Sequence, residues 1–99
     1  MNADTLHNLI KLRLSELAKK SFEELSHLES YQCEKVKLDG NTVTISVWKD
    51  MLRNREIRIV VQVYQHLYLG IGRMAADGFR IGINQLIKKL SKEELYEFS

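Results

Sequence analysis

The sequence predicts an α+β protein in two layers: a long N-terminal helix packed on an antiparallel β-meander of four to five strands, with a short C-terminal helix. Two patterns carry this prediction. Apolar and polar residues alternate from Thr42 to Ile83, and leucines recur at helical spacing before them. A chain of 99 residues is long enough for one such domain. We expect a helical segment over 1–30, the meander over 33–83 and the last helix over 91–98.

The alternation has the period of a strand with one buried face. Within residues 42–48 the apolar side chains stand at the odd positions Val43, Ile45 and Val47. Within residues 56–64 the odd positions are again apolar and β-branched, at Ile57, Ile59, Val61 and Val63. The same parity continues at Leu67, Leu69 and Ile71. Antiparallel sheets that are covered on one side show this pattern, so we expect the odd positions to face the helix.

The first turn of the meander follows from keeping this parity. In the preceding segment the apolar residues Val36 and Leu38 stand at even positions, so the loop after them needs an even number of residues. A two-residue turn at Gly40-Asn41 satisfies this requirement, because both residue types tolerate positive φ. It pairs Leu38 with Val43, and Val36 with Ile45.

Two later turns are also predicted. A tight turn centred on His66 places Tyr64 opposite Tyr68. Asp77-Gly78 is a strong hairpin signal. As a two-residue turn it inverts the parity, so that the side chains that follow it lie on the outward face, at Phe79, Ile81 and Ile83. The alternative is a strand that continues through a bulge and keeps them on the helix side. We favour the turn, because an uninterrupted strand would exceed the usual length of about 3–10 residues.

Residues 5–29 have the pattern of an amphipathic helix. Their apolar stripe comprises Leu6, Ile10, Leu14, Leu17, Leu25 and Leu28. One unbroken helix is the interpretation we favour, although it places Ser21 and Glu24 inside the stripe. The same two residues form a capping box, so the alternative is a break near Lys20-Ser21. After a further turn at Asn84-Gln85, a second capping box from Ser91 to Glu94 opens the C-terminal helix.

The composition is that of a soluble globular protein, with 44% hydrophobic and 28% charged residues and a net charge of +2. The single cysteine excludes an internal disulfide. The N-terminal residues lack the basic start and apolar run of a signal peptide. No apolar run approaches the roughly 20 residues of a membrane helix. We therefore expect a cytoplasmic protein that does not engage membranes.

No motif for catalysis, cofactor binding or metal binding survives inspection. Residues 70–75 match the loose dinucleotide fingerprint G-x-G-x-x-A, but that motif requires a helix start within a βαβ unit, and antiparallel strands surround it here. The soft metal ligands are too few and too dispersed for a zinc site: His7, His27, His66 and Cys33. We interpret Cys33 as a small buried apolar residue. The sequence thus predicts a protein that is not an enzyme and has no cofactor, no metal and no identified small-molecule ligand.

The function that we expect is protein–protein interaction or self-association, for example as a homodimer, through the face of the sheet that the helix leaves open. Large apolar and aromatic side chains on that face need cover, because monomers rarely expose contiguous apolar patches. The residues that we expect to bind are Trp48, Arg58, Tyr64, Tyr68 and Met74. The rival is cover by the chain's own C-terminal helix, through Leu95, Tyr96 and Phe98.

The alternative function is nucleic-acid binding. Phosphate contacts would come from the arginines of residues 53–80, which are Arg53, Arg55, Arg58, Arg73 and Arg80. A helix followed by three strands and a helix resembles, in topology alone, the double-stranded-RNA-binding domain. The basic start of that module's last helix is not reproduced, because the lysines up to Lys92 run directly into Glu93 and Glu94.

Overall fold

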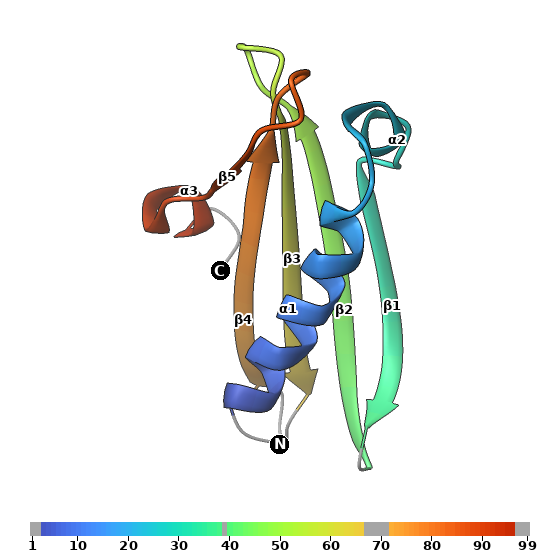
Figure 1. Cartoon of the computed structure of the whole chain (residues 1–99). Coiled ribbons are helices and arrows are strands. Elements are labelled where there is room, and N and C mark those ends of the chain that lie inside the picture. Colours follow the sequence, from blue (N-terminus) through green and yellow to red (C-terminus); the bar gives the residue numbers. More distant parts are fainter. Residues whose placement is uncertain (1–2, 39, 67–71, 97–99) are drawn as a thin grey trace.

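The computed structural model describes residues 3–38, 40–66 and 72–96. The elements follow in the order α1 (Ala3–Ala18), α2 (Phe22–Ser26), β1 (Tyr31–Leu38), β2 (Asn41–Met51), β3 (Ile57–His66), β4 (Gly72–Ile81), β5 (Ile87–Lys89) and α3 (Lys92–Tyr96). Within these residues the strands form one five-stranded antiparallel sheet in sequence order, and α1 crosses one of its faces (Figure 1). The predicted two-layer α+β fold is confirmed. None of the helices that the structure describes is long and apolar enough to cross a membrane.

The core lies between the helices and one face of the sheet, which we call the inward face. The helices contribute buried leucine and isoleucine side chains from Leu6, Ile10, Leu17 and Leu25. Opposite them lie the odd positions of β2, β3 and β4, of which Val43, Ile57, Ile59, Val61 and Val63 are fully buried. The alternation therefore identified the buried face correctly. The opposite face, with the even positions of β2 to β4, is the outward face.

The helical segment breaks where the first capping box stands, so the favoured unbroken helix is wrong. Ser21 Oγ accepts a hydrogen bond from the Glu24 N–H at 3.1 Å, and Glu24 Oε1 accepts one from the Ser21 N–H at 3.2 Å. This reciprocal cap starts α2 and satisfies backbone donors that a helix start leaves unpaired. A continuous helix would have turned both polar residues toward the core. The break instead lets α2 bury Leu25 separately.

The first hairpin has the predicted parity but a different register. Leu38 pairs with Asn41 and Val36 with Val43, so the predicted pairing of Val36 with Ile45 is wrong. The turn lies one residue earlier than Gly40-Asn41, and Asn41 is the first residue of β2. Gly40 takes the left-handed conformation, with φ of 79°, which glycine adopts without steric cost. Both registers keep the same face buried, so the alternation could not distinguish them.

The tight turn centred on His66 is also wrong. His66 is the last residue of β3 and pairs with Gly72, and Tyr64 pairs with Met74 rather than with Tyr68. Tyr68 lies outside the described residues, as do the other predicted parity positions of that segment, Leu67, Leu69 and Ile71.

Asp77-Gly78 is neither a hairpin turn nor a bulge, because β4 continues through it in unbroken register. Phe79 and Ile81 consequently stay on the inward face, where they are 5% and 1% exposed. Burial of these two side chains outweighs the local turn preference. A Cβ at position 78 would overlap the carbonyl oxygen of Ile59 and lie 2.8 Å from Leu90 Cδ1. Glycine is therefore needed at position 78 for close packing. The fifth strand, β5, follows after a later turn that includes Gln85.

The fold predicts that an introduced aspartate destabilises the protein far more on the inward face than on the outward face. Ile59→Asp places a carboxylate among fully buried side chains and should lower the free energy of unfolding by more than about 3 kcal/mol. Thr44→Asp lies on the outward face, half-buried, and should change it by less than about 1 kcal/mol. Urea denaturation followed by far-ultraviolet circular dichroism measures both. Equal, small losses in the two variants would contradict the assignment of faces.

Candidate interaction surface

The outward face has two regions of different chemistry. Near the ends of β2 and β4 a row of charged side chains crosses the sheet, since Asp50 pairs with Arg58, Arg58 with Arg80 and Arg80 with Lys88. We call it the charged row. Farther along the strands, from β1 to β4, the side chains are aromatic, hydroxylated, amide-bearing or thioether-bearing. We call these residues the aromatic region, and they are Tyr31, Thr44, Ser46, Trp48, Gln62, Tyr64, His66 and Met74.

Tyr31 and Trp48 form one half of the aromatic region. They pair across β1 and β2, and their ring centroids lie 4.3 Å apart at an interplanar angle of 47°. The Tyr31 hydroxyl lies 3.4 Å from Ser46 Oγ. Tyr31 nevertheless remains 44% exposed. The two rings are thus ordered against each other while the pair is still open to solvent.

Tyr64 and its neighbours form the other half. The rings of Tyr64 and His66 meet edge to face with centroids 4.6 Å apart, and His66 Nε2 lies 2.7 Å from Thr44 Oγ1. The Tyr64 ring also covers Gly72, where a Cβ would overlap the phenol. Met74, the cross-strand partner of Tyr64, is 42% exposed. Gln62 Nε2 lies 2.9 Å from the Met74 thioether sulfur.

The structure brings four of the five predicted binding residues to this face. Trp48, Tyr64 and Met74 lie in the aromatic region, whereas Tyr68 is outside the described residues. Arg58 belongs to the charged row instead. Its Nε and Nη2 donate to the two carboxylate oxygens of Asp50 at 3.0 and 2.6 Å, and its side chain is only 14% exposed. We therefore assign Arg58 to the border of the surface rather than to its centre.

Carboxylates surround the cations of the charged row. Glu94 of α3 places Oε2 3.9 Å from a guanidinium nitrogen of both Arg58 and Arg80. Two arginines directly opposite each other repel, and an anion shared between them offsets that repulsion. Glu56 lies beside the other end of the row, 3.8 Å from Arg80. The row is therefore close to neutral, and it ties α3 to the sheet.

The chain's own C-terminal part covers one corner of the outward face. Leu90, 9% exposed, lies against Gly78 of β4, and the neighbouring Val60 is fully buried although it points outward. Leu90 precedes α3, so this cover differs from the predicted cover by Leu95, Tyr96 and Phe98, which stays a prediction. Leu95 of α3 is half-buried, whereas the side chains of Tyr96 and Phe98 lie outside what the structure describes. Between this corner and β1 the aromatic region stays open among the described residues.

The five arginines do not gather on one surface. Arg58 and Arg80 are neutralised in the charged row. Arg73 pairs with Gln65, a buried residue of the inward face, and so lies on the side opposite to them. Arg53 and Arg55 lie in the connection between β2 and β3. No contiguous cationic face of the kind that tracks a phosphate backbone results from this placement.

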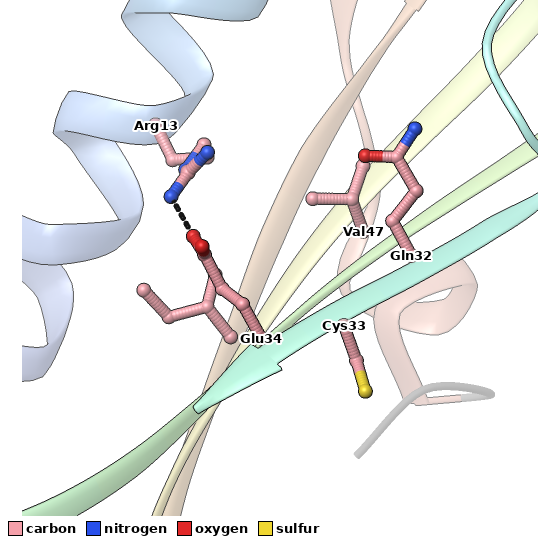
Figure 2. Close-up of a pocket in the computed structure, with 6 residues that line it drawn as sticks. Arg13, Gln32, Cys33, Glu34 and Val47 are labelled. Atoms are coloured by element: carbon pink, nitrogen blue, oxygen red, sulfur yellow. Dashed lines mark hydrogen bonds and ion pairs between the residues drawn. The ribbon is translucent and has the colours of Figure 1, made fainter. Parts of the chain in front are cut away.

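The groove between α1 and β1 offers no catalytic arrangement (Figure 2). Its volume is ≈ 180 Å³, and Arg13 of α1 forms an ion pair with Glu34 of β1 across it. Figure 2 shows the Cys33 side chain on the other side of β1, and its thiol is exposed, so the prediction of a buried cysteine is wrong. As an edge strand β1 has neighbours on one side only, which leaves its outward positions uncovered.

Cys33 and His66 are also too far apart for joint chemistry. Cys33 pairs with Ser46 and His66 with Thr42, which separates them by four residues along β2, or about 13 Å. Such a pair cannot share a proton or a metal ion. Among the described residues no three of the His, Cys, Asp and Glu side chains lie close enough together to hold a metal.

Glu56 is the titratable group whose environment is most distinct. Its side chain is 11% exposed and accepts hydrogen bonds from Lys88 Nζ at 3.1 Å and from Asn54 Nδ2 at 2.7 Å. The hydrogen bond from Lys88, followed by that from Asn54, lowers the pKa of Glu56 below its ordinary value of 4.5, and partial burial opposes them. These contacts join the β2–β3 connection to β5.

This lowered pKa predicts a dependence of stability on pH. A carboxyl whose pKa is lower in the folded protein stabilises it above the unfolded-state pKa, and that contribution disappears as the pH falls through the folded-state value. The free energy of unfolding should therefore decline below about pH 4.5. In Glu56→Gln the decline should be shallower. Urea titrations from pH 7 to pH 2.5 measure it, with Glu29→Gln at an exposed position as control. Identical profiles for the wild type and Glu56→Gln would contradict the role of these contacts.

Comparisons with models of protein families, with curated proteins and with solved structures give no match to this chain.

Proposed function

We propose that the protein is a non-enzymatic protein–protein interaction module that self-associates through the aromatic region. The observation that supports this proposal is two ordered groups on one face of the sheet: Tyr31 against Trp48, and Tyr64 against His66 with Met74 as its cross-strand partner. Neighbouring side chains order the large ones within each group, and Tyr31 and Met74 stay 44% and 42% exposed. Aromatic residues and methionine are the residue types that protein interfaces enrich.

The aromatic side chains are ordered before a partner binds, and this order favours a higher affinity. A side chain that is already held in one rotamer loses less conformational entropy when a partner covers it. Trp48 is held by Tyr31, and Tyr64 by His66 and by its position over Gly72. Such rigid aromatic groups are typical anchors of protein interfaces.

The surroundings of the aromatic region resemble the rim of an interface. Toward the ends of β2 and β4 it meets the charged row, in which Arg58 and Arg80 are paired with carboxylates. On the β1 side the outward positions Lys35 and Lys37 are exposed. An apolar centre with a polar, solvated rim is the usual anatomy of a protein–protein contact.

A second copy of this chain is the partner that we propose. An isologous dimer uses one patch twice, so a single ordered surface suffices for closure around a two-fold axis. We also place the protein in the cytoplasm. The exposed free thiol of Cys33 is compatible with a reducing compartment.

The test compares Met74→Glu with Leu12→Glu. Both replace an exposed apolar side chain by a carboxylate, but Met74 lies in the aromatic region and Leu12, 62% exposed, lies on α1. In sedimentation equilibrium the wild type and Leu12→Glu should show twice the chain mass of 11.6 kDa, and Met74→Glu should show the chain mass. Trp48 is the single tryptophan, so its fluorescence should report dilution of the dimer directly.

A wild type that remains monomeric at protein concentrations near 100 μM would contradict the proposal. A shortened chain that ends at Leu90 serves as the control for the C-terminal cover, because it removes α3 and keeps the aromatic region. It should still dimerise. Dimerisation only after this truncation would instead assign the cover of the outward face to the chain itself.

A further inference from the structure

A concave apolar surface lies between α2, the β2–β3 connection and the β4–β5 connection. These three segments lie at the end of the sheet where β2 and β4 finish (Figure 1). We call this surface the tip hollow, and its lining residues are Phe22, Met51, Asn54, Arg55 and Ile83. Its volume of ≈ 450 Å³ falls in the range of about 300–1,000 Å³ that is usual for small-molecule sites. Ile83 is 81% exposed and Met51 54% exposed. Large apolar side chains are therefore held around a hollow that is open to water.

Hydrogen bonds fix the walls of the tip hollow. The Phe22 N–H donates to Gln85 Oε1 at 3.0 Å, which ties α2 to the β4–β5 connection. Asn54 Oδ1 accepts from the Glu56 N–H at 3.0 Å, and Asn54 Nδ2 donates to the Glu56 carboxylate at 2.7 Å. The Leu52 N–H donates to the Glu56 carbonyl at 2.8 Å and closes the β2–β3 connection. The hollow is thus formed before any ligand enters, which reduces the entropy lost on binding.

Two strained residues stand at this end of the molecule. Arg55 has φ of 68° and Gln85 has φ of 67°, and they are the positive-φ residues other than glycine in the described chain. Arg55 lines the tip hollow, and Gln85 lines an adjoining hollow that shares Phe22 and Ile83 with it. Glycine would adopt these conformations without strain. Side chains retained in strained backbone are found preferentially at ligand sites.

The charges around the tip hollow indicate the sign of its ligand. Arg55 is the charged residue among the described residues that line it, and no ion pair to another described side chain engages its guanidinium. Glu23 lines the adjoining hollow and not the tip hollow. An anionic group would therefore be attracted to Arg55, and its apolar part would lie toward Phe22 and Ile83.

We propose that the tip hollow binds an anionic amphiphile, a molecule with an apolar chain and a carboxylate. The apolar chain packs among Phe22, Met51 and Ile83, and the carboxylate accepts hydrogen bonds from the Arg55 guanidinium. None of these residues belongs to the aromatic region, so this site is additional to the proposed dimer surface and does not depend on it.

The test is an NMR titration of the whole chain with sodium decanoate below its micelle concentration. Saturable chemical-shift changes are expected at the Met51 and Ile83 methyl groups and at the Phe22 amide. Ile83→Asp should weaken binding about tenfold or more, because it removes apolar contact. Arg55→Gln should weaken it about three- to fivefold, the usual effect of losing one exposed ion pair. Arg53→Gln is the matched control in the same connection and should leave binding unchanged.

The cationic probe decyltrimethylammonium tests the headgroup assignment. Binding of this probe as tightly as decanoate would overturn the assignment of an anion to Arg55. Absence of saturable shifts with millimolar decanoate would overturn the site. The chemical shifts of Phe22, Met51 and Ile83 could also change with protein concentration in the absence of decanoate. That result would mean that a second copy of the chain occupies the tip hollow, and it would overturn the proposal. Because Ile83 is exposed, Ile83→Asp should keep the wild-type amide chemical shifts in the rest of the chain. An amide spectrum recorded before the titration checks that this variant is folded.

Discussion

The packing of helix side chains on the odd positions of β2, β3 and β4 is the contact on which the rest of the structure depends. Leu6, Ile10 and Leu25 are almost fully buried against Ile59 and Val61. Because successive strand residues point to opposite faces, a slip of one residue would turn the whole apolar set toward water. This packing therefore fixes which side chains of each strand face outward, and the register of the strands decides which of them meet there.

The helices cover only one face, so the outward face must be stabilised by other means. Near the end of β4 the chain uses its own C-terminal part. Leu90 packs against Gly78, where the absence of a Cβ permits close approach, and Glu94 shields two facing arginines from each other. Farther along, cross-strand pairs such as Tyr31 with Trp48 pack on one another instead. Such pairs are the usual units of sheet stability, and here they leave an ordered, partly exposed surface.

The two proposed binding surfaces differ in shape and therefore in the ligand that suits them. The aromatic region lies on a sheet face and spans four strands, and a broad face of this kind suits another protein. The tip hollow is concave and formed by connections that hydrogen bonds hold in place, and a concave apolar site suits a small molecule. Arg55 and Gln85 have strained backbone conformations in those connections. The sheet therefore supplies one surface directly and positions the other through its loops.

The sequence by itself determined the fold class, the buried face of β2 and β3, and the outward position of Trp48, Tyr64 and Met74. Period-two alternation and a capping box are local signals, and burial of the core side chains favours the same structure that these signals predict. Trp48, Tyr64 and Met74 could be placed on one face by parity alone, without knowledge of which residues pair across the sheet. The Ser21–Glu24 capping box is the sequence signal that marks the break between α1 and α2.

The tertiary structure alone decided which turn signals are used. Asp77-Gly78 is locally favourable as a hairpin, but burial of Phe79 and Ile81 holds it in a strand, and the space taken by Leu90 explains its glycine. The tip hollow has no signal in the sequence, because Phe22, Met51 and Ile83 are distant in the chain and meet only when α2 and the two connections converge. Local propensities contribute about 1 kcal/mol each, whereas burial of several large side chains contributes more.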